Sequence, residues 1–186
     1  QRDARSPAYR NIDQPFTSLE MTSHFKITRL LLDTIRADLR RAHRFALERV
    51  GFVLTRFGQV ENGLLVVLAH SYQPVDDADY VVDARYGAVI NGNAFRKAMQ
   101  QAYSQPVGLF HIHCHEHVGK PSPSLIDIRE ANAFVPDLFH VRPNVPHGAL
   151  IVSLDSISGR IWLSEQQPAM EIDRFSIVGA PMMDIR

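Results

Sequence analysis

The sequence has little of the material that several classes of protein require. Its only cysteine, Cys114, excludes an internal disulfide framework and favours a reducing compartment. No apolar run approaches the ~20 residues of a membrane-spanning helix, and the N-terminus has no apolar signal core. Lysine plus arginine and aspartate plus glutamate both number 20, so no basic excess draws the chain to nucleic acid or an anionic membrane. We therefore expect a cytoplasmic protein with no nucleic-acid partner and no membrane partner.

What the sequence does contain is enough apolar material for one core, because 45% of its 186 residues are hydrophobic. Residues 1–22 carry two prolines and scattered charge, and they show no period of 2 or 3.6. We predict an N-terminal arm or tail over residues 1–22 and a single domain over residues 23–186.

Hydrophobic periodicity and turn residues predict the order β-α-β-β-α-β-α-β-β-β, an α+β domain whose mixed, curved sheet is flanked by helices. The two strands after the first helix read as a central hairpin. Asn93 is the predicted cap of the second helix, and Pro136 is the predicted end of the third. In chain order the predicted elements cover residues 25–28, 29–41, 45–58, 63–75, 93–103, 107–114, 124–135, 148–154, 160–164 and 171–179.

Four histidines at alternate positions mark the stretch GLFHIHCHEHVGKPSPSLID, residues 108–127. Alternate residues of a strand share a face, so His111 and His113 project together while Phe110 and Ile112 point to the opposite, apolar side. An isolated H-x-H at the end of a strand is more often a solvent-exposed edge face. The pair by itself therefore does not establish a metal site.

The segment after these histidines adds a carboxylate. Ser124 opens a predicted helix and Asp127 falls in its first turn, a spacing that is also typical of a capping box. Two histidines from a strand and one aspartate from the next helix make three ligands, with a fourth position left for water. This is the arrangement of a catalytic zinc site, and imidazole ligands favour zinc (Zn²⁺) over magnesium.

These residues resemble the motif of the JAMM, or MPN-type, metallopeptidases, which runs from a glutamate through H-x-H to S-x-x-D. The resemblance assigns His111, His113 and Asp127 as metal ligands and Ser124 as the motif serine. The segment ERVGFVL matches the upstream E-x-x-G, which makes Glu48 the catalytic carboxylate. As an order of elements the resemblance extends over residues 25–179, and it implies the JAMM/MPN (cytidine-deaminase-like) fold.

Two features depart from the family pattern. Cys114 stands where the family usually has proline, and the loop from His113 to Ser124 is a few residues longer than in eukaryotic members. The longer loop leaves His113 and His115 as an alternative ligand pair. We predict His111 and His113, because the GLF lead-in matches the family's strand end.

The resemblance also implies how the reaction proceeds. Glu48 would accept a proton from the attacking water and return it to the leaving amine, while the Ser124 hydroxyl would help to stabilise the oxyanion. Without the downstream motif, Glu48 would read as a strand-start charge that is solvated or paired with Arg44 or Arg49.

The other chemically active side chains have simpler interpretations. We expect His115 and His117 to be exposed loop or substrate-contacting residues. Cys114 has no recognisable activating partner and reads as a small strand residue. Trp162 reads as a core residue. The remaining histidines read as surface or hydrogen-bonded residues, namely His24, His43, His70, His140 and His147.

The resemblance implies a zinc-dependent isopeptidase or peptidase that cleaves after the C-terminus of a ubiquitin-like protein, either to remove a conjugate or to mature a precursor. The chain is similar to JAMM peptidases encoded beside ubiquitin-like, E1-like and E2-like proteins in bacterial conjugation or antiphage systems, so these are the expected partners. Two alternatives remain: a JAMM peptidase that processes a sulfur-carrier protein, and a non-catalytic MPN-type scaffold. The complete set of motif residues argues against the scaffold.

Overall fold

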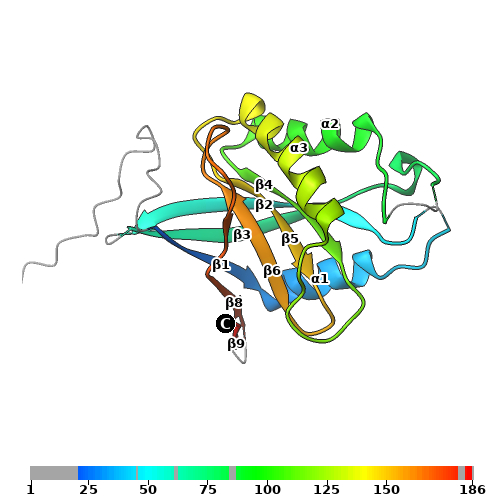
Figure 1. Ribbon diagram of the computed structural model, residues 1–186, viewed down its shortest axis with the longest axis horizontal. Coiled ribbons are helices and arrows are strands. Elements are labelled where there is room, and N and C mark those ends of the chain that lie inside the picture. Colours follow the sequence, from blue (N-terminus) through cyan, green and yellow to red (C-terminus); the bar gives the residue numbers. More distant parts are fainter. Residues whose placement is uncertain (1–20, 45, 61–62, 84–86, 180–182, 186) are drawn as a thin grey trace, which may run out of the picture.

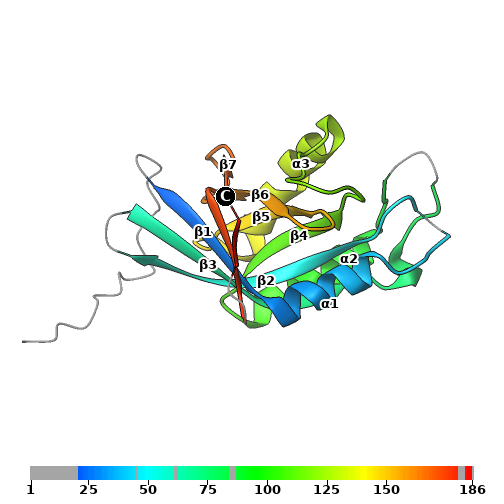
Figure 2. The same cartoon turned by 90° about the horizontal axis from the view of Figure 1, so that it is seen from below.

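A twisted nine-stranded sheet organises the computed structural model, which describes residues 21–44, 46–60, 63–83, 87–179 and 183–185 (Figures 1 and 2). The strand order is β7-β6-β5-β4-β2-β3-β1-β8-β9. The strands are β1 Thr22–Thr28, β2 Val50–Val60, β3 Leu64–Pro74, β4 Gly108–Cys114, β5 His147–Val152, β6 Ile157–Trp162, β7 Met170–Glu171, β8 Arg174–Val178 and β9 Met183–Ile185. The helices are α1 Arg29–Leu39, α2 Gly92–Ser104, α3 Leu125–Val141 and the 3₁₀ turn η2 Asp77–Asp79.

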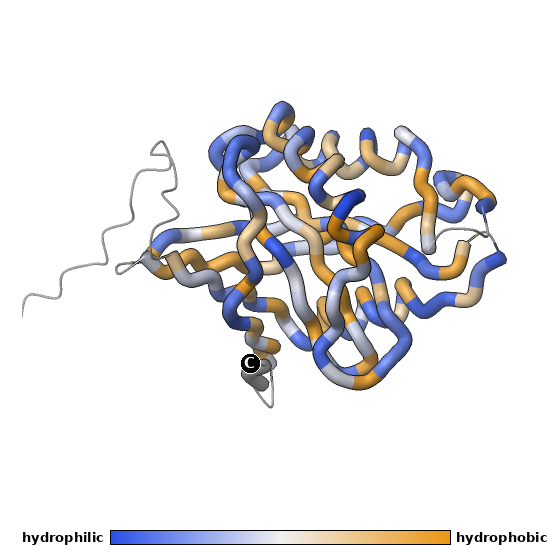
Figure 3. Tube along the Cα trace, viewed as in Figure 1, coloured by the Kyte–Doolittle hydropathy of each residue, from blue (hydrophilic) through white to orange (hydrophobic). Residues whose placement is uncertain are grey.

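The helices cover opposite faces of this sheet (Figure 1). Leu32, Ile35 and Leu39 of α1 pack in one hydrophobic cluster, while α2 and α3 pack in a second cluster on the other side. Hydrophobic residues recur along the strands between these layers (Figure 3). The architecture confirms the predicted α+β class with a mixed sheet, since β1 pairs in parallel with β3 while β2 and β3 are antiparallel.

The alternation predicted for the histidine-bearing strand is present in β4. Phe110 and Ile112 belong to the α1-side cluster, and Leu109 belongs to the cluster under α2 and α3. His111 and His113 therefore lie on the α3 side of the sheet. β2 and β3 form the predicted hairpin, which occupies the middle of the sheet.

Two predicted helix boundaries were wrong. The second helix is capped by Asn91, whose Oδ1 accepts from the backbone N–H groups of Asn93 at 2.8 Å and Ala94 at 3.4 Å. The third helix does not end at Pro136, which lies inside α3. Proline removes one helical hydrogen bond, but the turn beyond it buries Leu138 and Phe139, and that burial offsets the loss.

The last predicted strand, residues 171–179, is split into β7 and β8. The predicted arm falls almost wholly on residues 1–20, which lie outside the described residues. Thr22, placed in the arm by the sequence, begins β1 instead. Among the helices the structure describes, none combines the length and apolar character that crossing a bilayer requires.

Candidate metal centre

His113 and His115, two positions apart in the sequence, come together at the end of β4. His113 lies near the strand's C-terminus and His115 just beyond it, and their Nε2 atoms are 3.2 Å apart. The backbone N–H of His115 donates to the Val152 carbonyl at 2.9 Å, so sheet pairing with β5 continues one step past β4. This pairing keeps the alternation of the strand and directs both rings to the same side.

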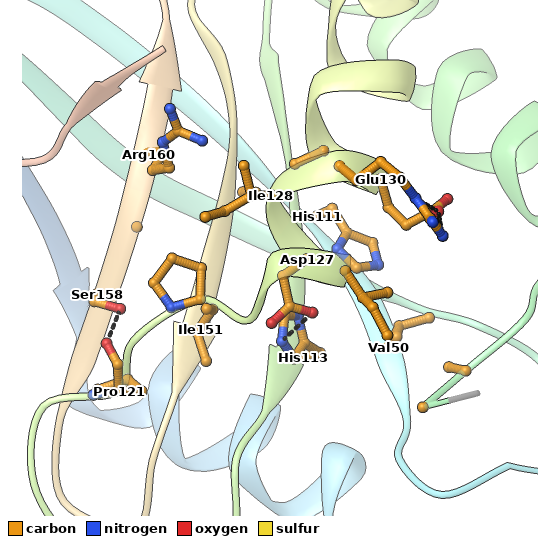
Figure 4. Close-up of a pocket in the computed structure, with 18 of the residues that line it drawn as sticks. Val50, His111, His113, Pro121, Asp127, Ile128, Glu130, Ile151, Ser158 and Arg160 are labelled. Atoms are coloured by element: carbon orange, nitrogen blue, oxygen red, sulfur yellow. Dashed lines mark hydrogen bonds and ion pairs between the residues drawn. The ribbon is translucent and has the colours of Figure 1, made fainter. Parts of the chain in front are cut away.

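Asp127 completes this group from the first turn of α3. Its Oδ1 lies 3.4 Å from His113 Nε2, and its Oδ2 lies 3.6 Å from His115 Nε2. The carboxylate and the His113 ring face each other in Figure 4. We call His113, His115 and Asp127 the ligand cluster.

The two imidazoles of the ligand cluster are spaced as ligands of a zinc ion would be. Ligands about 2.0–2.1 Å from a tetrahedral zinc are separated from each other by roughly 3.3–3.4 Å. The two Nε2 atoms, 3.2 Å apart, are close to that value, while the distances of 3.4 and 3.6 Å run from His113 to Asp127 Oδ1 and from His115 to Asp127 Oδ2, so each imidazole approaches a different carboxylate oxygen. Two imidazoles and one carboxylate are also the donor types of a catalytic zinc site.

A capping box holds the carboxylate in this position. Ser124 Oγ accepts from the Asp127 N–H at 3.1 Å, and the Ser124 N–H donates to Asp127 Oδ2 at 2.7 Å. Burial alone would raise the pKa of Asp127, but interactions with His113 and Ser124 outweigh it and hold that pKa well below its usual range. Asp127 is therefore ionised at neutral pH. The Ser124 hydroxyl keeps its own hydrogen available to donate.

Glu48 approaches the histidines from the segment before β2. One potential metal-ligand atom each from Glu48, His113 and His115 lies within 4.8 Å of the other two, so these three residues also form a possible set of ligands. The Glu48 backbone N–H donates to the Gly87 carbonyl at 2.9 Å. A Cβ at Gly87 would lie 1.9 Å from Glu48 Oε1, so only glycine allows this approach.

The surroundings of Glu48 change its acidity. Burial raises its pKa, while His113 lowers it in part and Asp127 raises it further. Arg49, one of the partners considered from the sequence, instead pairs with Asp77 at 2.6 Å. Glu48 thus combines partial burial, a raised pKa and direct proximity to two imidazoles.

His111 occupies a different environment from the ligand cluster. Its ring packs edge-on against Phe52 and Phe134, at centroid distances of 5.8 and 5.2 Å. Burial, followed by repulsion from His113, lowers the pKa of His111 to about 3, so the ring is neutral at physiological pH. Of the predicted ligands, the structure brings together His113 and Asp127, and it leaves His111 among aromatic rings.

His115, which the sequence placed in an exposed loop, takes the position beside His113. The sequence signal for His115 as a ligand was the loop before Ser124, which is a few residues longer than in eukaryotic JAMM members when it is counted from His113. With His111 and His113 as ligands, ten residues precede Ser124, whereas with His113 and His115 only eight do. His117 is exposed, as expected, because its N–H bonds to the His115 carbonyl in a turn that ends the alternation.

The other side chains singled out from the sequence have structural roles. Cys114 is buried on the α1 side, and burial raises the pKa of its thiol, which disfavours a nucleophilic thiolate. Trp162 is a core residue, as predicted. His24 and His147 are buried and hydrogen-bonded, to Ser176 Oγ and to backbone groups respectively.

His113 and Asp127 of the ligand cluster line a cavity of about 670 Å³ that extends between α3 and strands β5 and β6 (Figure 4). Ile128 and Ile151 form apolar parts of its wall. Arg160 lies on the other side of Ile128 from Asp127 in this view. A cavity of this size accommodates a small ligand or several atoms of a bound peptide.

Comparisons with known proteins give no family for this chain. No protein-family model and no curated protein matches it. Among solved structures, it is similar to the STIL N-terminal domain of Trichoplax adhaerens, with a TM-score of 0.34 and 14% sequence identity. The match covers 73% of this chain and 40% of that one, so the chain spans less than half of that structure. A similarity at this level says nothing about function.

Proposed function

We propose that the protein is a zinc-dependent isopeptidase or peptidase of the JAMM/MPN type, which cleaves after the C-terminus of a ubiquitin-like protein. The observation that carries this proposal is the convergence of His113, His115 and Asp127 at separations of 3.2 to 3.6 Å, with Glu48 beside them. The α+β sheet with helices on both faces is compatible with the JAMM/MPN fold.

The ligand cluster would hold the metal through two neutral imidazoles and one carboxylate. Asp127 is assigned as the third ligand because its oxygens lie at ligand-to-ligand distances from both rings. When bound, zinc would polarise the substrate carbonyl and lower the pKa of water. This assignment uses the His113/His115 pair in place of the predicted His111/His113 pair.

Glu48 then serves as the proton carrier. Its raised pKa lies closer to neutral pH than that of an exposed glutamate, which suits a group that must accept a proton and later donate it. It takes a proton from the attacking water and gives one to the leaving amine. The Ser124 hydroxyl, which accepts from the Asp127 N–H, can donate its hydrogen to the developing oxyanion.

Exposed apolar side chains beside these residues favour a protein substrate. Leu47 is 71% exposed next to Glu48, and Leu125 and Ile126 are 85% and 52% exposed next to Asp127. Val118, in the loop after His115, is 71% exposed. Large apolar groups gathered around one site are typical of a surface that binds another protein.

The test is cleavage of ubiquitin-like fusions that carry a short C-terminal extension, with a sulfur-carrier fusion assayed in parallel. Glu48→Gln should keep zinc and fold but lower turnover by at least ~10²–10⁴-fold, because glutamine cannot accept the proton. The variant should still form a stable complex with uncleaved substrate. Cys114→Ser is the matched control and should cleave normally, whereas a zinc chelator should abolish cleavage.

Near-normal cleavage by Glu48→Gln would show that Glu48 carries no proton in the reaction. Cleavage that resists the chelator but requires Cys114 would indicate a thiol enzyme. Cleavage of the sulfur-carrier fusion alone would assign the same chemistry to cofactor or amino-acid biosynthesis.

A further inference from the structure

The cavity beside the ligand cluster contains a cation with an unsatisfied donor. Arg160 is partly buried on β6, and its guanidinium lies over the Trp162 ring at 5.5 Å. Its Nη1 is buried and has no hydrogen-bond acceptor within the described part of the chain. A buried donor without an acceptor destabilises the folded state, and more so when the group is charged. Nη1 has therefore lost its hydration without gaining a partner, and an anion beside the part of Arg160 that lines the cavity would offset the cost of this buried charge.

Within the described residues, Arg160 forms no ion pair with an acidic side chain. Glu171 lies directly opposite it in the pairing of β6 with β7 and also lines the cavity. The residues that the structure describes form no ion pair between these two side chains. On the α3 wall, Arg129 and Glu130 pair with each other at 2.8 Å. The positive charge of Arg160 is thus available to an anion inside the cavity.

The space around Arg160 suits an inserted chain. Ala149, directly opposite Arg160 on β5, is small and leaves room above the sheet. Ile128 and Ile151 line the cavity between Arg160 and the ligand cluster. Apolar walls lower the local dielectric constant and so strengthen an interaction between Arg160 and a carboxylate. The guanidinium also matches a carboxylate in geometry, since it can donate two parallel hydrogen bonds.

We propose that Arg160 is a specificity-determining residue that binds a carboxylate of the substrate segment lying in this cavity. The carboxylate is a Glu or Asp side chain, or a free C-terminus, because both present the same acceptor pair. The inference rests on the proposed function for the reaction that follows binding. The binding of the acidic group itself requires neither Glu48 nor turnover.

The experiment measures peptide binding to the Glu48→Gln protein, which separates recognition from cleavage. The probes are fluorescein-labelled polyalanine peptides, in which one alanine at a time becomes Glu or Gln. At one position the Glu peptide should bind at least about tenfold more tightly than its Gln counterpart, because a charge-assisted hydrogen bond contributes about 1.5–3 kcal/mol. Free and amidated C-termini distinguish the two sources of the carboxylate.

Variants assign this preference to one residue. Arg160→Gln should remove the preference for Glu, and Arg160→Glu should reverse it toward a Lys peptide. Arg129→Gln is the matched control, because Arg129 is exposed on α3 and paired with Glu130, and it should keep the preference. Thermal unfolding of each variant checks that it is folded. If an Arg160 variant fails to fold, the binding of Glu and Gln peptides to the protein with Arg160 intact still tests the inference.

The fluorescence of Trp162, the only tryptophan in the chain, locates the bound group. A carboxylate at Arg160 should change this emission with or without a zinc chelator, whereas one bound at the metal should not. Equal binding of every Glu and Gln pair, or a preference that survives in folded Arg160→Gln, would overturn the inference. A preference without any cleavage by the unsubstituted enzyme would support the inference and contradict the proposed function. Cleavage of the substrate without a preference for Glu over Gln would support the proposed function and contradict the inference.

Discussion

His111 and His113 stand two residues apart on one strand and one face and line the same cavity, yet their nearest partners differ. His111 meets the rings of Phe52 and Phe134 and stays neutral, with a pKa of about 3. His113 meets a second imidazole at 3.2 Å and a carboxylate at 3.4 Å. A shared face is therefore not enough to make a ligand. What the neighbouring helix presents at each position decides whether a histidine packs or binds.

A third histidine completes this comparison. His147 is fully buried, its Nδ1 accepts from the Leu109 N–H at 3.1 Å, and its Nε2 lies 3.0 Å from the Arg142 carbonyl. Both ring nitrogens are used, so no lone pair is left for a metal. Hydrogen bonding thus excludes His147 as a ligand, whereas His111 is set apart by the aromatic rings around it.

The largest expected effect separates His111 from the ligand cluster. Purified protein should contain close to one zinc per chain, and His113→Ala, His115→Ala and Asp127→Ala should each weaken binding at least ~100-fold, since even outer residues of zinc sites contribute 10–100-fold. Elemental analysis after dialysis measures the loss. His111→Ala and the exposed control His117→Ala should keep the metal.

The opposite pattern, with zinc lost in His111→Ala and kept in His115→Ala, would restore the pair predicted from the sequence. It would also show that the aromatic rings around His111 do not prevent this histidine from binding zinc.

The second expected effect concerns acid stability and His147. Burial lowers its pKa from 6.5 to about 4, so the unfolded chain binds a proton at a higher pH than the folded protein does. The free energy of unfolding should therefore fall as pH drops from about 6.5 to 4, by up to about 3 kcal/mol from this residue. Urea unfolding between pH 7 and pH 4 measures it.

His147→Gln provides the control, because glutamine does not titrate. The variant should be less stable than the unsubstituted protein at pH 7, but it should lack this part of the decline at lower pH. An unchanged decline in the variant would mean that other groups cause the acid sensitivity.

The smallest expected effect is on folding stability without metal. His111→Ala should lower the free energy of unfolding by roughly 2 kcal/mol, because it leaves a gap between Phe52 and Phe134. His115→Ala, on a less confined ring, should change it by no more than about 0.5 kcal/mol. Urea unfolding in the presence of a chelator compares them. Equal losses of unfolding free energy in both variants would show that packing confines His111 no more than it confines His115.

Local patterns were sufficient for most of the fold. Alternation and turn residues located the β2–β3 hairpin and β4, and helical spacing located α1 and α2, because each pattern reports on burial within one element. The errors at Asn93 and Pro136 arose where contacts outside the element prevailed. Asn93 donates to Asp79 at 2.7 Å, and the turn after Pro136 is held by buried Leu138 and Phe139.

The sequence by itself determined that His111 and His113 share a face, that Ser124 and Asp127 open a helix, and that Glu48 precedes a strand, because these follow from local periodicity and capping. Only the tertiary structure decided which histidines meet Asp127. Pairing of His115 with Val152 carries the strand alternation past β4, and α3 places Phe134 over His111 and Asp127 over His113. These relations join residues from different elements, and no local pattern specifies how two elements register against each other.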